Sequence, residues 1–399
     1  MLKKCSLYIH IPFCSLKCGY CDFYSIPSPS QEIREKIIQQ IIYQIHNFIR
    51  VYKNPEITTV YIGGGTPTFL TNSELYMLLS GISGAVNLPS EYTVEANPEN
   101  LTPEKCLILE ETGVSRLSIG IQTLNPGYLE LLGRNAGIEN IAFVLEKIIP
   151  KWKGDINLDL MTLLPGQKLE EALNDCRNLI SFSPDHISLY ALTLEKGTPL
   201  YTRFQKGDFT EHTQEEASEI LHALYNMLKN NGYDRYEISN FCRPGKKSRH
   251  NTSYWKMEPY IGCGPSAVST LPSPEGPVRL ENPRNLAQFL EGRKIKWNIQ
   301  QTPLASKEFL FEHFMMGLRT VKGVDLKHMK RCFPDISPAD IFKNLFQQWE
   351  QRQLCNFSQA SLSLTPQGMD IMNSLLLDLL AVIDGLQDFS VSWPDIHSS

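Results

Sequence analysis

The sequence predicts an α/β fold built on a parallel sheet. In the first half of the chain, short β-rich runs alternate with amphipathic segments, and the alternation repeats six times. Polar or glycine residues follow the ends of successive strands, at Gly63–Gly65, Glu95, Gln122 and Asp159. Repeated strand–helix units form parallel sheets with right-handed crossovers, and ligands bind at the carboxyl ends of their strands. The periodicity leaves open whether the sheet is doubly wound or forms a barrel.

Hydrophobic periodicity and helix-end signals define the individual elements. The β-rich runs predict strands over residues 6–11, 58–63, 92–96, 116–121, 156–161 and 186–192. The amphipathic segments predict helices over residues 31–50, 71–84, 103–112, 125–147, 167–180 and 213–232. The helix starts "TNSE" and "TPEK" resemble capping boxes, and Gly232 is a typical helix end.

The pattern changes after about residue 235. We expect an α/β domain over residues 1–235, then a connecting region over 236–300 that carries the element "HNTSYW". Residues 301–385 predict a small, mostly helical C-terminal domain, because long apolar helical segments begin near residue 305. The remaining residues, 386–399, predict a loosely held tail.

Charge and hydropathy exclude several classes of protein. The net charge of −5 gives no general affinity for nucleic acid, although Lys246, Lys247 and Arg249 form a local basic cluster. We see no apolar run long enough for a transmembrane helix, and the segment after Lys3 and Lys4 does not resemble a signal peptide. We therefore expect a cytoplasmic protein.

Three of the ten cysteines gather in "HIPFCSLKCGYCDFYS", residues 10–25. Cys14, Cys18 and Cys21 form a C-x3-C-x2-C pattern, which in a reducing compartment favours metal chemistry over disulfides. Closed structural zinc sites need four ligands, and no second cysteine pair at zinc-finger spacing is present. The pattern therefore favours an iron–sulfur cluster. If three cysteines hold four irons, one iron stays open to an external ligand.

With these cysteines the sequence resembles the radical S-adenosylmethionine (SAM) superfamily. The superfamily signature has the same spacing with an aromatic residue before the last cysteine, here Tyr20, and its second marker is "GGGTP", residues 63–67. The resemblance implies a partial (βα)6 barrel, a [4Fe–4S] cluster on the three cysteines, and SAM on the open iron, where reduction would cleave it to a 5′-deoxyadenosyl radical. It further implies a set of cofactor-binding residues: Tyr8, Tyr20, Gly64, Gly65, Thr66, Glu95, Gln122, Arg134 and Asp159.

The resemblance narrows to the branch that contains oxygen-independent coproporphyrinogen III dehydrogenase and the heme chaperones. Its motifs here are "YIHIPFC", "YIGGGTPTFL", "VEANPE", "SIGIQTLN", "LLPGQ" and "GYDRYEISNF". The dehydrogenase carries a fourth cysteine where this chain has Phe23, whereas "HNTSYW" and "LTPQGMDIMNSLL" match the chaperones. This favours a chaperone that binds heme and delivers it to an acceptor protein. The alternative is an oxygen-independent coproporphyrinogen III oxidase. Radical modification of another substrate, RNA included, is disfavoured by the acidity of the chain.

The "HNTSYW" element adds a candidate heme residue. Histidine is a common axial ligand of heme iron, and Tyr254 and Trp255 could supply flat apolar faces. The alternative is that His250 hydrogen-bonds within a turn while Trp255 packs in the core; the resemblance favours heme contact by His250. The expected partners are heme, a heme-acceptor protein and an electron donor such as a flavodoxin or ferredoxin. We expect no nucleic acid and no transmembrane segment; peripheral membrane association is compatible with the sequence.

Overall fold

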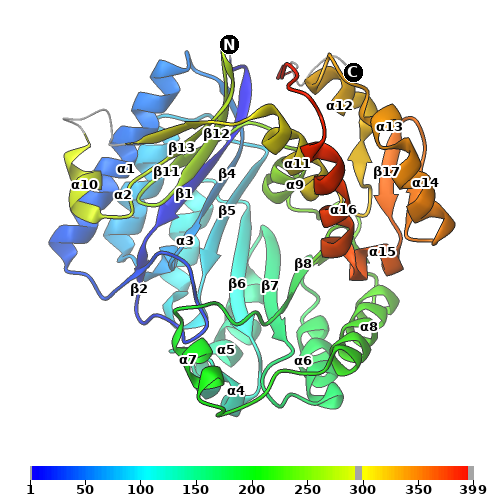
Figure 1. Cartoon of the computed structure of the whole chain (residues 1–399). Helices are drawn as coiled ribbons and strands as arrows, with labels where there is room; N and C mark the ends of the chain where they lie inside the picture. The colour runs from blue at the N-terminus through cyan, green and yellow to red at the C-terminus, as the bar shows by residue number, and fades with distance from the viewer. Residues whose placement is uncertain (1, 293–298, 394–399) are drawn as a thin grey trace.

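A twelve-stranded sheet forms the framework of the protein (Figure 1). The computed structural model describes residues 2–292 and 299–393. The strand order is β14-β13-β12-β11-β1-β4-β5-β6-β7-β8-β10-β9. Six strands are successively parallel: β1 (Lys4–Ile11), β4 (Glu56–Gly64), β5 (Glu91–Ala96), β6 (Arg116–Gln122), β7 (Asp155–Thr162) and β8 (His186–Ala191). Within the described residues β1 and β8 are not paired, so the predicted α/β fold is an open sheet, as a partial barrel requires.

Helices that follow the parallel strands in the chain cover the outer face of the sheet (Figure 1). They are α1 (Gln31–Val51), α2 (Asn72–Ser83), α3 (Pro103–Glu111), α6 (Leu169–Ser181) and α8 (Gln214–Asn230), with the short α7 (Pro199–Gln205) after β8. Threonine side chains accept from the first turns of α2, α3 and α8, at Thr71, Thr102 and Thr213. Each cap satisfies a backbone N–H that has no partner inside its helix.

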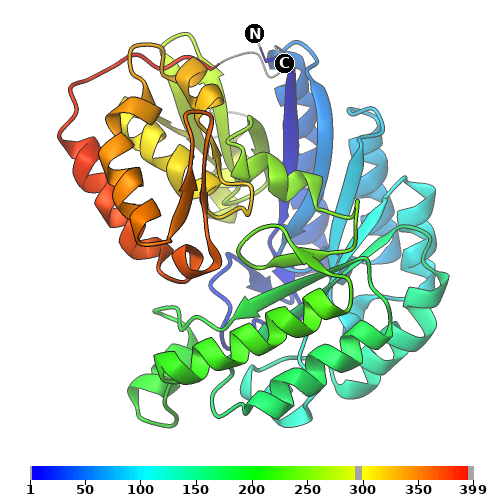
Figure 2. The ribbon, with the colours of Figure 1, turned by 90° about the vertical axis from the view of Figure 1, so that its right-hand side faces the viewer.

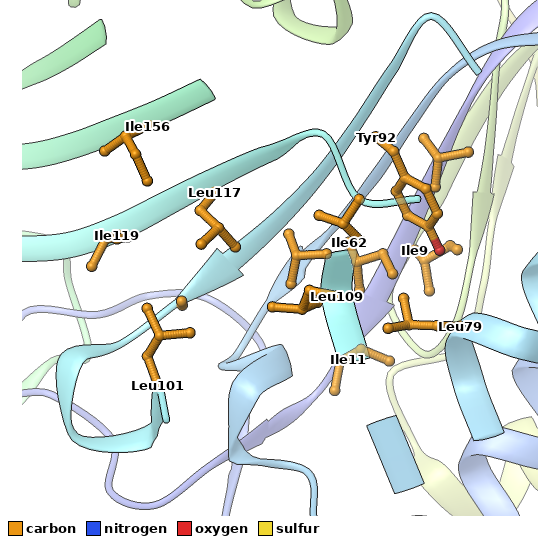
Figure 3. Packing of buried hydrophobic residues seen from close by; sticks show 14 of the residues in the cluster. Ile9, Ile11, Ile62, Leu79, Tyr92, Leu101, Leu109, Leu117, Ile119 and Ile156 are labelled. Carbon is orange, nitrogen blue, oxygen red and sulfur yellow. The ribbon is translucent and has the colours of Figure 1, made fainter. Parts of the chain in front are cut away.

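Apolar side chains alternate along the parallel strands and pack against these helices (Figure 3). Ile9, Ile62 and Leu117 have no measurable exposure, and they belong to the same core as Leu79 of α2 and Leu109 of α3. Side chains alternate between the two faces of a strand. The intervening residues therefore face the inside of the curved sheet, and many of them are polar.

One predicted helix is wrong. The segment 125–147 forms α4 (Pro126–Leu131), a break, α5 (Ile138–Phe143) and a π-helical turn. Gly133 has φ +63°, which no right-handed helix accommodates, and Gly137 occupies the N-cap position of α5. The amphipathic pattern continues through the break, which is why the sequence indicated a single helix.

The segment after α8 extends the sheet at both edges. Strands β9 (Asp234–Arg235) and β10 (Asn240–Cys242) lie beside β8, and α9 (Arg249–Trp255) follows. Beyond β1 come β11 (Tyr260–Cys263), β12 (Val268–Ser273), β13 (Gly276–Glu281) and β14 (Gln300–Pro303), with α10 (Leu286–Glu291) between the last two. The strands of this segment therefore flank the six parallel strands on both sides.

Residues 306–393 form a lobe beside the sheet (Figure 2). It contains α11 (Ser306–Gly317), α12 (Leu326–Cys332), α13 (Pro338–Ile341), α14 (Lys343–Gln351), α15 (Pro366–Asp370) and α16 (Met372–Asp384). A three-stranded sheet of β15 (Val324–Asp325), β17 (Ser361–Leu364) and β16 (Cys355–Phe357) accompanies these helices. The lobe has its own core around Phe314, Phe346 and Trp349.

The first residues of the predicted tail pack against the core of the C-terminal lobe. Phe389, Val391 and Trp393 pack against it, so the first part of the tail is held by apolar contacts. Residues 394–399 lie outside the described residues. Among the helices that the structure describes, none combines the length and apolarity needed to cross a membrane.

A buried carboxylate fastens α9 to the parallel sheet. Glu91 of β5 is 6% exposed and accepts from the backbone N–H groups of Arg249 (2.8 Å) and His250 (2.9 Å). Its Oε1 also accepts from the hydroxyl of Ser248 at 3.3 Å. The helix N-terminus and the carboxylate have complementary charge, so this contact is favourable.

We predict that Glu91→Gln destabilises the protein by about 1–3 kcal/mol, because the amide group of glutamine turns a donor toward the N–H groups of α9. Urea unfolding followed by circular dichroism measures the change. Glu56→Gln is the control, since Glu56 is paired with Lys4 at an exposed position and its loss costs no more than about 1 kcal/mol. Equal midpoints for the two variants would contradict the role given to Glu91.

Candidate cluster and cofactor site

The three cysteines lie on one closed loop. Strands β2 (Phe13–Cys14) and β3 (Ile26–Pro27) pair in parallel at its base, and the N–H of Ser28 donates to the carbonyl of Cys14 at 2.8 Å. Cys14, Cys18 and Cys21 are half-buried, and all ten cysteines are free thiols. Besides burial, Cys18 helps to raise the pKa of the Cys14 and Cys21 thiols, and Cys14 helps to raise that of Cys21, so the three groups lie near one another.

Contacts from several elements fix the shape of this loop. The N–H of Gly19 donates to the carbonyl of Leu132, and its carbonyl accepts from the N–H of Leu200, both at 2.8 Å. Nε2 of His10 lies 2.8 Å from the carbonyl oxygen of Tyr24. A carbonyl only accepts, so Nε2 of His10 carries the proton. Leu132 lies at the break after α4, so that break supports the cysteine loop.

The glycine turn after β4 packs directly against the start of the cysteine loop. The N–H of Gly65 donates to the carbonyl of Ile11 (2.8 Å), and the N–H of Thr66 donates to that of Phe13 (2.7 Å). A Cβ on Gly65 would lie 2.5 Å from the Phe13 carbonyl oxygen. Gly64 has φ +109°, and a Cβ there would lie 2.5 Å from the ring of His10. Only glycine allows this approach.

A hydrogen-bonded chain joins two of the thiols. Thr66 Oγ1 donates to Cys14 Sγ at 3.6 Å and accepts from Asn97 Nδ2 at 3.0 Å. Asn97 Oδ1 accepts from Arg134 Nη2 at 3.2 Å, and Arg134 Nη1 donates to Cys18 Sγ at 3.7 Å. Donors to sulfur tune and orient metal-bound thiolates. Thr66 and Arg134, two of the residues that the resemblance implies for cofactor binding, therefore contact the cysteine loop, and their role toward a cofactor stays a prediction.

The donor set fits an iron–sulfur cluster. Three thiols share a fixed loop, sulfur receives hydrogen bonds, and Arg134 Nε is buried without a partner among the described residues. Within those residues no three His, Cys, Asp or Glu side chains converge on one ion. Cluster cysteines each bind a different iron, so they do not need to converge. Burial raises the pKa of the Cys14 and Cys21 thiols, and metal binding must displace these protons.

Two carboxylates line the inside of the sheet near the glycine turn. Glu95 accepts from the hydroxyl of Tyr61 at 2.7 Å and from the N–H of Gly64 at 3.1 Å. Asp159 accepts from Asn157 Nδ2 at 2.7 Å. Burial raises the pKa of Glu95 to about 7, and the charge of Asp159 adds to the shift. Burial also raises the pKa of Asp159 to about 6.

The other predicted cofactor residues lie on this face or beside the loop. Gln122 ends β6 at an irregularity of the strand pairing and has φ +71°, a costly conformation for a residue with a side chain. Tyr20 packs against the small cluster around Leu132, and burial raises the pKa of its hydroxyl. The hydroxyl of Tyr8 lies 3.0 Å from Nδ1 of His10. The cysteine loop, the glycine turn and the two carboxylates thus share one end and face of the sheet.

Two family models match the chain. The model of the radical SAM superfamily matches residues 8–179, and that of the HemN C-terminal domain matches residues 304–371. Proteins named heme chaperone HemW from Buchnera aphidicola subsp. Acyrthosiphon pisum and Bacillus subtilis are 34% and 33% identical to the chain. These matches cover 94% and 93% of the chain, and 98% and 97% of the relatives. The chain belongs to the HemW family of the radical SAM superfamily.

This membership confirms the resemblance predicted from the sequence and implies a [4Fe–4S] cluster and SAM as cofactors. A solved structure of coproporphyrinogen III oxidase (HemN) from Escherichia coli, a radical SAM enzyme, is also similar. It has a TM-score of 0.80 and 19% identity, covering 96% of this chain and 91% of the enzyme. At that identity the likeness shows the fold alone.

His250 of this HemW family member is enclosed by its neighbours. It is 1% exposed and stacks on Tyr61 with ring centroids 5.0 Å apart. Its Nδ1 lies 2.8 Å from Thr59 Oγ1, and its Nε2 lies 3.0 Å from the hydroxyl of Tyr254. Thr59 donates its own proton to Ser6, so Nδ1 of His250 is the donor and Nε2 accepts from Tyr254. Heme ligation by His250 stays a prediction, and it requires the Tyr254 hydroxyl to release Nε2.

The sequence did not single out three residues of the site. Asn97 joins Thr66 to Arg134, Tyr61 binds Glu95, and His10 supports both Gly64 and the cysteine loop. Asn97 directly follows a predicted strand at the edge where ligands bind, so its position was a usable signal. Tyr61 and His10 occupy strand positions whose neighbours are apolar, and that alternation indicates an inward side chain.

We predict that the two carboxylates make stability depend on pH. Their pKa values in the folded protein, about 7 and about 6, exceed the ordinary values of about 4, so the folded state binds protons more tightly. The free energy of unfolding should fall as pH rises from about 4 to about 7, and the fall should end above the folded pKa. Glu95→Gln should flatten this fall. Urea midpoints across the range, for protein without iron or SAM, measure it.

Glu139→Gln is the control for this experiment, because Glu139 is exposed on α5. It should keep the dependence of the unchanged protein. If Glu95→Gln shows the same fall in stability as Glu139→Gln, Glu95 does not carry the raised pKa.

Proposed function

We propose that the protein is a heme chaperone that carries a [4Fe–4S] cluster and SAM and delivers heme to an acceptor protein. One observation carries the proposal: relatives named heme chaperone HemW are 33–34% identical over more than nine-tenths of the chain. The cluster would be held by Cys14, Cys18 and Cys21. SAM would be held on the inner face of the sheet, and heme would be the cargo.

The polar residues of the inner face have distinct proposed roles toward SAM. The carbonyls of Gly64 and Gly65 would accept from its ammonium group, and Glu95 and Asp159 would bind its other polar groups. Arg134 carries a permanent charge, and its buried Nε would pair with an acceptor on the cofactor. Gln122 and Tyr20 would bound the adjoining space. When bound, the cluster would supply the electron for radical chemistry on SAM.

The residue at position 23 favours the chaperone function over the enzymatic alternative. Two residues after Cys21, where the dehydrogenase has its fourth cysteine, Phe23 is 69% exposed. An exposed aromatic ring suits contact with a flat ligand and contributes no thiolate. The fold is shared with a coproporphyrinogen III oxidase, so the test of function must include that reaction.

The proposal includes partners and a cellular location. An electron donor such as a flavodoxin or ferredoxin would reduce the cluster, and the acceptor would be a protein that uses heme. We place the protein in the cytoplasm, where reducing conditions keep the ten cysteines as thiols. Peripheral membrane association is compatible with this location.

We predict that Cys18→Ser abolishes the iron–sulfur absorbance and the bound iron and sulfide after anaerobic reconstitution, because the loop then offers one ligand fewer. Cys106→Ser is the matched control, since Cys106 is a half-buried thiol on α3 away from the loop. Normal iron and sulfide in Cys18→Ser would remove Cys18 from the ligand set.

We predict that the reconstituted protein binds heme, seen as a saturable change of the Soret band, without converting coproporphyrinogen III in the presence of SAM and a reductant. Both measurements use one preparation. Efficient formation of protoporphyrinogen would contradict the chaperone function and support the coproporphyrinogen III oxidase instead. Absence of heme binding would also contradict the proposed chaperone function.

His250→Ala belongs to the same titration. If His250 binds the iron, the variant should change the position of the Soret band. An unchanged band would remove His250 as a ligand without affecting the rest of the proposal.

A further inference from the structure

A cavity of about 620 Å³ lies between the sheet and the C-terminal lobe. Its walls come from the inner face of β1, β11 and β12, from the end of the cysteine loop, and from α11. Small-molecule sites commonly have volumes of about 300–1,000 Å³ and form where two parts of a protein meet. The location and the size therefore suit a ligand larger than a metabolite fragment.

Aromatic side chains form the walls of this cavity. They include Tyr8 on β1, Phe23 and Tyr24 on the cysteine loop, and Trp255 on α9. Phe23 is the most exposed of these rings at the surface, whereas Trp255 Nε1 is buried without a partner in the described chain. Rings contributed by three separate elements favour a flat aromatic ligand, because stacked and edge-on contacts both gain from quadrupole interactions.

Two guanidinium groups at this cavity lack a carboxylate partner among the residues that the structure describes. Arg284 has no carboxylate partner among the described residues, and Arg319 has a buried Nε without a partner there. Arg319 lies over Trp255, with 5.8 Å from its Cζ to the ring centroid. Arg279 differs, since Glu312 binds it through two contacts of 2.9 Å. Guanidinium groups without a carboxylate partner in the described chain suit ligand carboxylates, which arginine binds in pairs of hydrogen bonds. Asp22 and Glu258 supply the remaining acidic groups of the lining.

The cavity adjoins the proposed SAM site. Tyr8 lines the cavity, bonds to His10, and lies beside Tyr61 with ring centroids 6.3 Å apart. His10 supports Gly64, and Tyr61 binds Glu95. A ligand here would share a wall of side chains with the cofactor while occupying separate space.

We propose that this cavity is the heme site, with the porphyrin between Phe23 and Trp255 and its propionates on Arg284 and Arg319. The inference rests on the proposed function and adds the location of the cargo. A second cavity of about 650 Å³ lies across Trp255 and is lined by Lys247, Lys322, Lys327 and other basic residues. It offers cations but no aromatic ring from the cysteine loop, so we favour the first cavity.

Titration of the full-length, cluster-loaded protein with hemin tests the location. Phe23→Ala should weaken binding about fivefold through the loss of ring contact, and Phe23→Trp should restore it. Arg284→Glu should weaken binding about tenfold or more, and Arg284→Lys should recover part of the loss. Thermal unfolding of each variant shows that it is folded.

Two controls address other surfaces. Phe143→Ala removes an exposed ring from α5, and the double change Lys322→Glu and Lys327→Glu reverses charge in the second cavity. Both should stay within about twofold of the unchanged protein. A loss confined to the lysine variant, with Phe23→Ala and Arg284→Glu unaffected, would overturn the location and move heme to the second cavity. No heme binding by the unchanged protein would overturn the proposed function itself.

Discussion

The close approach of two backbones organises this end of the protein. The glycine turn after β4 lies against the first residues of the cysteine loop, with Gly65 bonded to Ile11 and Thr66 bonded to Phe13. The turn has no side chains in the way, and a Cβ on Gly65 would collide with the Phe13 carbonyl. This pairing sets where the loop begins. It also places the Thr66 hydroxyl on the sulfur of Cys14.

Side chains alternate between the two faces of the parallel strands, and the two faces have different roles. Residues such as Ile9 and Leu117 bury their side chains under the helices, and this burial stabilises the sheet. Residues that alternate with the apolar positions face inward and are hydrogen-bonded: Tyr61 donates to Glu95, and Asp159 accepts from Asn157. Desolvation inside the sheet raises the pKa of the carboxyls of Glu95 and Asp159, so the interior is polar without being fully charged. The outer face of each strand thus supports the fold, while the inner face carries the polar residues of the candidate site.

Local patterns in the sequence predicted much of this architecture. The six parallel strands lie where β-rich runs occur, within a few residues at each end, and the glycine turn and cysteine spacing place the site at one edge. The break after α4 was missed because the apolar period runs through Gly133. Its cause is tertiary, since the carbonyl of Leu132 is needed by Gly19 of the cysteine loop. Asn97 was missed for a similar reason: its partners, Thr66 and Arg134, come from distant parts of the chain.

The "HNTSYW" element shows how one motif can hold a structure and shape a surface at once. His250 donates a hydrogen bond to Thr59 and accepts one from Tyr254. The carboxylate of Glu91 accepts from the backbone N–H groups at the start of the same helix. Residues four apart on a helix share a face, so Tyr254 stays with His250 against the sheet. Trp255 then points in another direction and lines both cavities beside the C-terminal lobe. A histidine buried in this way fixes the position of the tryptophan. At the proposed heme site, the motif would therefore act through Trp255 even when the imidazole itself binds only protein.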